Sequence, residues 1–346
     1  MSPSLVETSL SLYDALAEPL AWLVIGTFLA GAAADLRSRT LARRVTVGAW
    51  GLFAVFWLVQ TPHFVFEQKS AIEGVGAFVA IPISAYVGYL LWQGRDSLLV
   101  LSRAIAAMGV VFMPFEMIAP LRQALVETVT VHTEVLMAQL GQDPAVISGQ
   151  RVCREYATGG SCLERYPDYR STFFFETTNP YTGDPYTITY TILIACTGIG
   201  SMAIFAGLVS AVKAPLRRKV RALAVSLPVI YVLNLGRNVF IGLSFGQMRA
   251  QVAPELIAST FGFSLAQDPA LVSYYVADRI LAQTGSVLAL VAITYLVVRE
   301  LPEVLGVVED VLFVVTGSEW DLGAALDVET PRAEGQPVRA DGEGSD

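Results

Sequence analysis

The sequence predicts an all-α fold, a polytopic transmembrane helical bundle. Of its 346 residues, 54% are hydrophobic and only 16% are charged, and the mean hydropathy is +0.54. The apolar residues are concentrated in runs long enough to cross a bilayer. The net charge is −8 and no large basic patch is present, which excludes nucleic acid as a partner.

About seven spans are predicted, and basic residues orient them. A loop after the first span carries four arginines, and the loop at 213–221 carries five basic residues. Because basic loops remain in the cytoplasm, these loops place the N-terminus outside and the C-terminus inside. The predicted spans cover about 20–34, 45–60, 75–92, 98–118, 187–212, 222–245 and 273–298.

Four regions are expected along the chain. Residues 1–140 hold the N-terminal transmembrane helices and an amphipathic helix at about 121–140, whose charged side chains place it at the outer interface. A polar extracytoplasmic insert follows at 141–186, and the catalytic transmembrane helices cover 187–300. The tail at 301–346 is acidic and predicted to be largely disordered and cytoplasmic.

Three residues stand out within the last three predicted spans. Cys196 lies among small residues, and Arg237 and Arg279 are charges where lipid makes a charge costly. At 1.5 Å per residue, Cys196, Arg237 and Arg279 lie about 14, 12 and 9 Å below the outer ends of their spans. We therefore expect the three side chains to meet in one site near the outer face of the membrane.

The neighbours of both arginines form polar stripes at helical spacing. We expect the stripe around Arg237 on the sixth span and the stripe around Arg279 on the seventh span to face the site. Asp278 precedes Arg279 by one position and is expected to point elsewhere on the helix. The stripes consist of Asn234, Arg237 and Asn238, and of Tyr275, Arg279, Gln283 and Ser286.

This combination of groups suits nucleophilic catalysis by a thiolate. An apolar setting makes a cysteine inert, and two guanidinium groups reverse this by favouring the thiolate and donating to an oxyanion. The histidines His63 and His132 fall outside the three spans, although a base role for His132 stays open. Arginine is a poor literal proton donor because of its high pKa, so a water, the leaving amine or a desolvated guanidinium is expected to carry the proton.

Several structural alternatives stay open at this point. Cys196 alone fits a small buried residue, Arg237 a structural charge satisfied by Glu116, and Arg279 a side chain that extends to the outer interface. A different class of protein also fits these residues. In a transporter or a protein that binds anions or lipid head groups, Arg237 and Arg279 would contact the ligand and Cys196 would be incidental.

The predicted insert contains Cys153 and Cys162. A disulfide is the expected state of this pair rather than a metal site, since no histidine or further cysteine lies nearby. No metal ion and no cofactor is predicted for the chain. The external aromatic residues are interpreted as packing or interfacial residues, with substrate gating as the alternative. They are Tyr166, Tyr169, Phe173, Phe174 and Phe175.

At these positions the chain resembles the exosortase/archaeosortase family, and most of all its haloarchaeal archaeosortases. The motifs are Ala-Cys-Thr-Gly at 195–198, Asn-Leu-Gly-Arg-Asn at 234–238 and Asp-Arg at 278–279. The resemblance implies a cysteine transpeptidase, or thiol protease, with Cys196 as the acyl-thioester nucleophile. It further implies Arg237 as proton donor and Arg279, where many members have histidine, as stabiliser of the transition state.

The resemblance also implies partners and a location. The substrates would be secreted surface proteins, including the S-layer glycoprotein, that end in a Pro-Gly-Phe motif, a transmembrane helix and a basic cluster. The enzyme would cleave near the motif and pass the new C-terminus to a membrane ether lipid. It would be a multi-pass protein of the cell membrane with its active site on the extracytoplasmic side.

Overall fold

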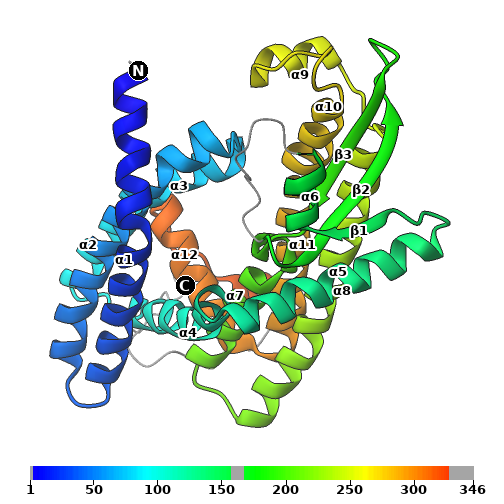
Figure 1. Ribbon diagram of the computed structural model, residues 1–346. Helices are drawn as coiled ribbons and strands as arrows, with labels where there is room; N and C mark the ends of the chain where they lie inside the picture. Colours follow the sequence, from blue (N-terminus) through cyan, green and yellow to red (C-terminus); the bar gives the residue numbers. More distant parts are fainter. Residues whose placement is uncertain (1–2, 157–166, 327–346) are drawn as a thin grey trace, which may run out of the picture.

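The computed structural model describes residues 3–156 and 167–326. Within these ranges, six helices are long and apolar enough to cross a membrane, and the shorter apolar helix α7 (Ile199–Ala211) packs among them. Figure 1 shows the helices as two groups, α1 to α3 on one side and α8, α10 and α11 on the other. The predicted polytopic helical bundle is therefore confirmed.

The first group packs around a core of large apolar side chains. Phe28, Trp50 and Leu91 from three different helices are buried in it. The Trp50 indole Nε1 donates to the Ser102 hydroxyl at 2.9 Å, so its polar atom is paired inside the bundle. The elements of this group are α1 (Pro3–Asp35), α2 (Arg39–Pro62), the π-helical turn η1 (His63–Glu67), α3 (Ala71–Trp92) and α4 (Leu98–Met117).

The second group is joined to the first through a close contact between α4 and α7. A Cβ added at Gly207 would lie 2.4 Å from the Ala104 carbonyl oxygen, so only glycine allows the two backbones to approach this closely. The remaining helices of this group are α8 (Leu216–Gly246), α9 (Pro254–Phe261), α10 (Ala270–Tyr274), the π-helix η3 (Tyr275–Ala282) and α11 (Gln283–Glu300).

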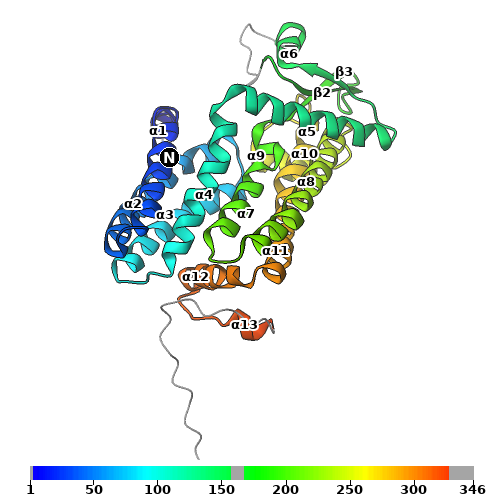
Figure 2. The same ribbon diagram turned by 90° about the horizontal axis from the view of Figure 1, so that it is seen from below.

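The insert lies at one end of the bundle (Figure 2), over helix α5 (Ala119–Gln139). Helix α5 is not among the six candidate spans and runs across the ends of the other helices, as its charged side chains predict. An antiparallel sheet of order β1-β2-β3 buries Phe173, Tyr190 and Ile188 against α5 and α8. Its elements are β1 (Ala145–Ser148), α6 (Gly149–Tyr156), β2 (Arg170–Thr178) and β3 (Pro185–Thr191).

The predicted span at 187–212 is wrong in its first half. Residues up to Thr191 belong to β3, a 3₁₀ turn η2 (Ile194–Thr197) follows, and only α7 is α-helical. Threonine alternates with isoleucine and tyrosine through β3, and this period of two favours a half-buried strand. The sheet thus continues past the expected boundary of the insert at 186.

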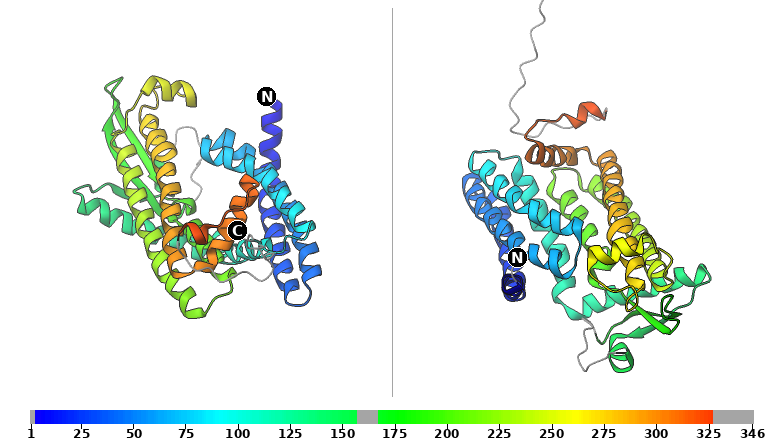
Figure 3. Two further views of the ribbon diagram at one scale, coloured as in Figure 1. Left: turned by 180° about the vertical axis from the view of Figure 1, so that it is seen from behind. Right: turned by 90° about the horizontal axis from the view of Figure 1, so that it is seen from above.

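The tail is ordered over its described part, in contrast to the predicted disorder from residue 301. It forms η4 (Pro302–Val304), α12 (Leu305–Thr316) and α13 (Leu322–Ala325), and α12 lies across the helix ends opposite the sheet (Figures 2 and 3). Arg95 in the α3–α4 loop donates to Asp310 of α12 at 3.1 Å. This ion pair binds α12 to the bundle. Residues 327–346 lie outside the described ranges.

Candidate active site

Cys196 lies in the 3₁₀ turn η2, between the end of β3 and the start of α7. It is a free, half-buried cysteine. The turn ends at Gly198, whose φ of 78° is in the left-handed region that side chains disfavour. A Cβ there would also lie 3.0 Å from the Asn234 Cγ. Glycine at 198 therefore lets the cysteine turn lie against α8.

Two asparagines of α8 hold this turn. The side-chain Nδ2 atoms of Asn234 and Asn238 both donate to the Cys196 carbonyl oxygen, each at 2.8 Å. Asn238 in turn accepts a hydrogen bond from the Tyr190 hydroxyl of β3 at 3.3 Å. The backbone of the cysteine is thus fixed from the same face of α8 that the sequence stripe predicts.

Arg237 lies on that face and pairs with Asp278 of η3. Its Nη2 donates to Asp278 Oδ1 at 2.7 Å, and the carboxylate is buried. The alternative that Glu116 neutralises Arg237 is therefore wrong. The carboxylate that pairs with Arg237 is Asp278. The same finding corrects the prediction that Asp278 points away from the site.

Asp278 also approaches the second arginine. Arg279 Nε lies 3.6 Å from Asp278 Oδ2, and Arg279 Nη2 donates to the Tyr274 hydroxyl at 3.1 Å. Glu73 of α3 lies 3.6 Å from Arg279 Nη1. One buried carboxylate therefore lies between the two guanidinium groups. The alternative in which the Arg279 side chain extends to the outer interface is wrong, because these contacts hold it inside the bundle.

The π-helix explains why the sequence misplaced Asp278. A π-helix has more residues in each turn than an α-helix, so side chains from 275 to 282 depart from α-helical spacing. Two members of the predicted stripe have other contacts. Tyr275 stacks on Phe261 with ring centroids 3.9 Å apart, and the buried Gln283 donates to Ser70 of α3 at 2.9 Å.

Asn234 and Asn238 hold the Cys196 turn against the face of α8 that carries Arg237. Asp278 pairs with Arg237 and approaches Arg279, so the cysteine turn and both guanidinium groups belong to one connected cluster. The Nε atoms of Arg237 and Arg279 are buried and donate no hydrogen bond within residues 3–156 and 167–326, although Arg279 Nε forms an ion pair with Asp278 Oδ2 at 3.6 Å. A buried donor without an acceptor is costly. The Arg237 Nε–H group is therefore available to a bound oxyanion or carbonyl oxygen.

The other predicted candidates have different contacts. The exposed His132 contacts the Tyr231 hydroxyl at 2.6 Å, and His63 contacts Gln68 at 3.0 Å. The proposed Cys153–Cys162 pair lies outside the residues whose side chains are described. Phe173 and Phe175 are buried against α8, as packing residues are.

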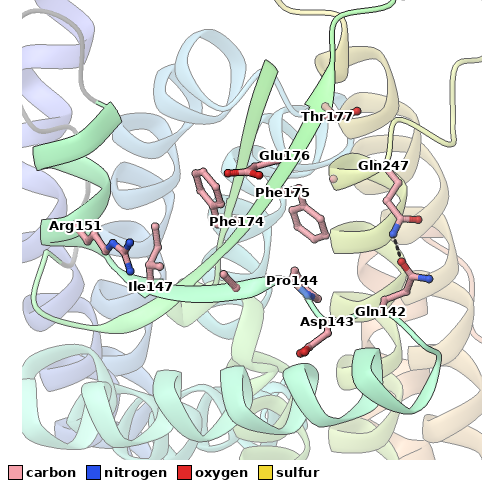
Figure 4. A pocket seen from close by; sticks show the side chains of 12 residues that line it. Gln142, Asp143, Pro144, Ile147, Arg151, Phe174, Phe175, Glu176, Thr177 and Gln247 are labelled. Atoms are coloured by element: carbon pink, nitrogen blue, oxygen red, sulfur yellow. Dashed lines mark hydrogen bonds between the residues drawn. The ribbon is translucent and has the colours of Figure 1, made fainter. Parts of the chain in front are cut away.

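A hollow of about 600 Å³ lies between the sheet and the far end of α8. Figure 4 shows β2 residues such as Phe174 and Glu176 on one side and Gln247, bonded to Gln142, on the other. None of Cys196, Arg237 and Arg279 lines it. The hollow is therefore distinct from the thiol cluster.

The chain matches known proteins over most of its length. The family model described as "Transmembrane exosortase" matches residues 17–272, which include Cys196 and Arg237 and end before Arg279. Archaeosortase A of Haloferax volcanii is 46% identical over 318 residues, covering 89% of this chain and 96% of that protein. Archaeosortase A of Natronomonas pharaonis is 42% identical over 317 residues, covering 88% and 94%. No solved structure matches. This chain belongs to the exosortase family of membrane-embedded cysteine transpeptidases.

Proposed function

We propose that Cys196 is the nucleophile with which this transpeptidase cleaves C-terminal sorting signals of surface proteins. The observation that carries the proposal is the cluster of one free thiol and two guanidinium groups, in which the buried Arg237 Nε donates no hydrogen bond within the described residues. Burial disfavours the Cys196 thiolate, and the two guanidinium charges oppose this effect and so favour the reactive form of the cysteine.

The reaction follows from the chemistry of these groups. The Cys196 thiolate attacks a backbone carbonyl carbon, and the oxyanion accepts hydrogen bonds from Arg237 and Arg279. The carbon–nitrogen bond breaks, the leaving amine takes up a proton, and a thioester forms on Cys196. A head-group amine of a membrane ether lipid then attacks the thioester, forms an amide and releases the thiol. We assign Arg237 to the donation of a proton during this reaction and Arg279 to stabilisation of the transition state.

The active site faces the extracytoplasmic side in this proposal. The basic loop between α7 and α8 lies at the end of the bundle where α12 packs, and basic loops remain in the cytoplasm. The sheet and η2 lie toward the opposite end (Figure 2). A substrate held by its own transmembrane helix would present a motif at the outer boundary of the bilayer, next to Cys196.

The substrates we propose are surface proteins such as the S-layer glycoprotein, with a Pro-Gly-Phe motif, a transmembrane helix and a basic cluster. The names of the two relatives support a surface-sorting role, since both are archaeosortases. The large acidic tail sequence and the polytopic bundle are compatible with a multi-pass protein of an archaeal cell membrane.

Replacing Cys196 by serine, with Cys153→Ser as the matched control, tests the proposal. The first variant is expected to accumulate unprocessed substrate that retains its C-terminal helix, and the control to process it normally. Arg237→Lys is expected to impair processing at least tenfold, because an ammonium cannot reproduce a planar fork of donors. Mass spectrometry of the substrate C-terminus reads the result. Normal processing by Cys196→Ser and Arg237→Lys would favour the transporter or anion-binding alternative.

A further inference from the structure

Strand β3 is an edge strand that leads directly to the nucleophile. Within residues 3–156 and 167–326, the sheet order β1-β2-β3 leaves one side of β3 without a neighbouring strand. Cys196 follows the last residue of β3, Thr191, by five positions. Pro185 begins the strand, a position that suits an edge because proline has no N–H to donate.

The register identifies which backbone groups point away from the sheet. Ile192 N donates to Ser171 O at 2.8 Å, and the pairing of β2 with β3 continues without a bulge. In an antiparallel ladder, alternate residues direct both backbone groups toward the partner strand. Tyr190 and Ile188 therefore bond to β2. Thr189 and Thr187 direct their N–H and C=O groups outward.

These outward groups are open to a ligand. Thr187 is exposed and Thr189 partly exposed, and in the described part of the chain no residue hydrogen-bonds to the outward backbone groups of either. Helix α8 packs on the apolar face of the sheet, where the Tyr190 hydroxyl donates to Asn238. Figure 1 shows β3 rising beside β2 near α10.

We propose that the segment of the substrate preceding the scissile bond adds to the free edge of β3 as an extra strand. This inference rests on the proposed function and names how that site holds its substrate. An extended peptide pairs with a sheet edge through main-chain hydrogen bonds that do not depend on its side chains. Surface proteins with different sequences ahead of one short motif could all be bound in this way.

The direction of the added strand follows from the membrane. The substrate runs from its external domain to its transmembrane helix, and β3 runs from the insert to the cysteine turn. The two chains are therefore parallel. In a parallel pair, Thr187 and Thr189 each bond two substrate residues that flank them, so every second substrate N–H is engaged. The added strand delivers the scissile carbonyl to Cys196 and the two arginines.

The first experiment modifies the substrate alone. The probe is a synthetic peptide carrying Pro-Gly-Phe, with eight residues before it and the first turns of the transmembrane helix after it. Its affinity for the full-length Cys196→Ala protein in detergent is measured after N-methylation of one amide at a time. We expect binding to weaken about fivefold to tenfold at alternate positions and little at those between. A scan without this period of two would overturn the proposal.

The second experiment modifies the edge. Thr189→Pro removes an outward N–H and none of the N–H groups that bond to β2, whereas Thr189→Val keeps the outward N–H. The proline variant is expected to bind the peptide at least fivefold more weakly than the valine variant. Equal affinities would contradict strand addition. Failure of the proposed function can be told apart from failure of strand addition. If the proposed function is wrong, the Cys196→Ser variant processes substrate, whatever the peptide-binding experiments show.

Discussion

In the part of the chain that the structure describes, Asp278 is the one carboxylate that reaches both arginines of the active site, at 2.7 Å from Arg237 and 3.6 Å from Arg279. We expect Asp278→Asn to reduce processing about 100-fold, because an uncharged amide no longer fixes the two guanidinium groups and small misplacements of catalytic groups are costly. The amount of folded protein should change less than the activity. Processing rate and membrane protein level are measured together.

Glu73→Gln provides the comparison for Asp278. Glu73 also approaches Arg279, at 3.6 Å, but its side chain is 42% exposed. Ion pairs of exposed groups contribute little, so this variant is expected to stay within about threefold of the parent. Equal losses in the two variants would mean that the site needs only negative charge near Arg279, and the bridging role of Asp278 would be wrong.

The sequence predicted some of these residues and missed others for a physical reason. Asn234, Arg237 and Asn238 lie on one face because α8 is a regular helix, and the spacing of three and four residues is sufficient to show it. Asp278 was misplaced because η3 is π-helical, and nothing in its composition signals the wider turn. Tyr274, which contacts Arg279, was missed in favour of Tyr275 for the same reason.

At the scale of elements, the turn between β3 and α7 depends on a glycine. Gly198→Ala is expected to reduce both stability and activity, since a non-glycine residue at positive φ costs about 1–2 kcal/mol and its Cβ would press on Asn234. Thermal unfolding and processing rate measure the effect. Gly200→Ala is the matched control, because no atom lies within 4 Å of its added Cβ. A neutral Gly198→Ala would show that the turn tolerates a side chain.

Hydropathy alone does not distinguish strand β3, which precedes Cys196, from the start of a membrane-spanning helix. Apolar residues from 187 to 212 form one run in the sequence, and the run was interpreted as one span. Alternating threonines in its first five residues indicate a strand, and the site depends on this break because it places Cys196 in a turn rather than within a helix. Because Cys196 lies in this turn, a rise of about 1.5 Å per residue along one helix does not describe its depth. Cys196 lies near the arginines for a different reason, because Asn234 and Asn238 of α8 donate hydrogen bonds to its carbonyl oxygen.

For the whole molecule, the orientation of the bundle can be measured directly. Thr182 lies in the β2–β3 hairpin and Ser318 follows α12, at opposite ends of the structure. In intact cells, a membrane-impermeant maleimide is expected to label Thr182→Cys above the parent signal and to label Ser318→Cys only after lysis. The reverse pattern would place Cys196 at the cytoplasmic side and exclude processing of exported proteins by this site.

Because α12 packs on the bundle, we expect the lifetime of a truncated chain to depend on whether it ends before or after this helix. Arg95 lies over the Phe313 ring at 3.7 Å and pairs with Asp310 and Glu319, so the last helices brace the loop between α3 and α4. A stop codon at 327 would spare every one of these contacts, whereas one at 305 would remove them all. Pulse-chase degradation should therefore show a long-lived product in the first case and a short-lived one in the second, although the two differ by only 22 residues of ordered chain. Equal lifetimes would mean that this brace adds nothing to the persistence of the bundle.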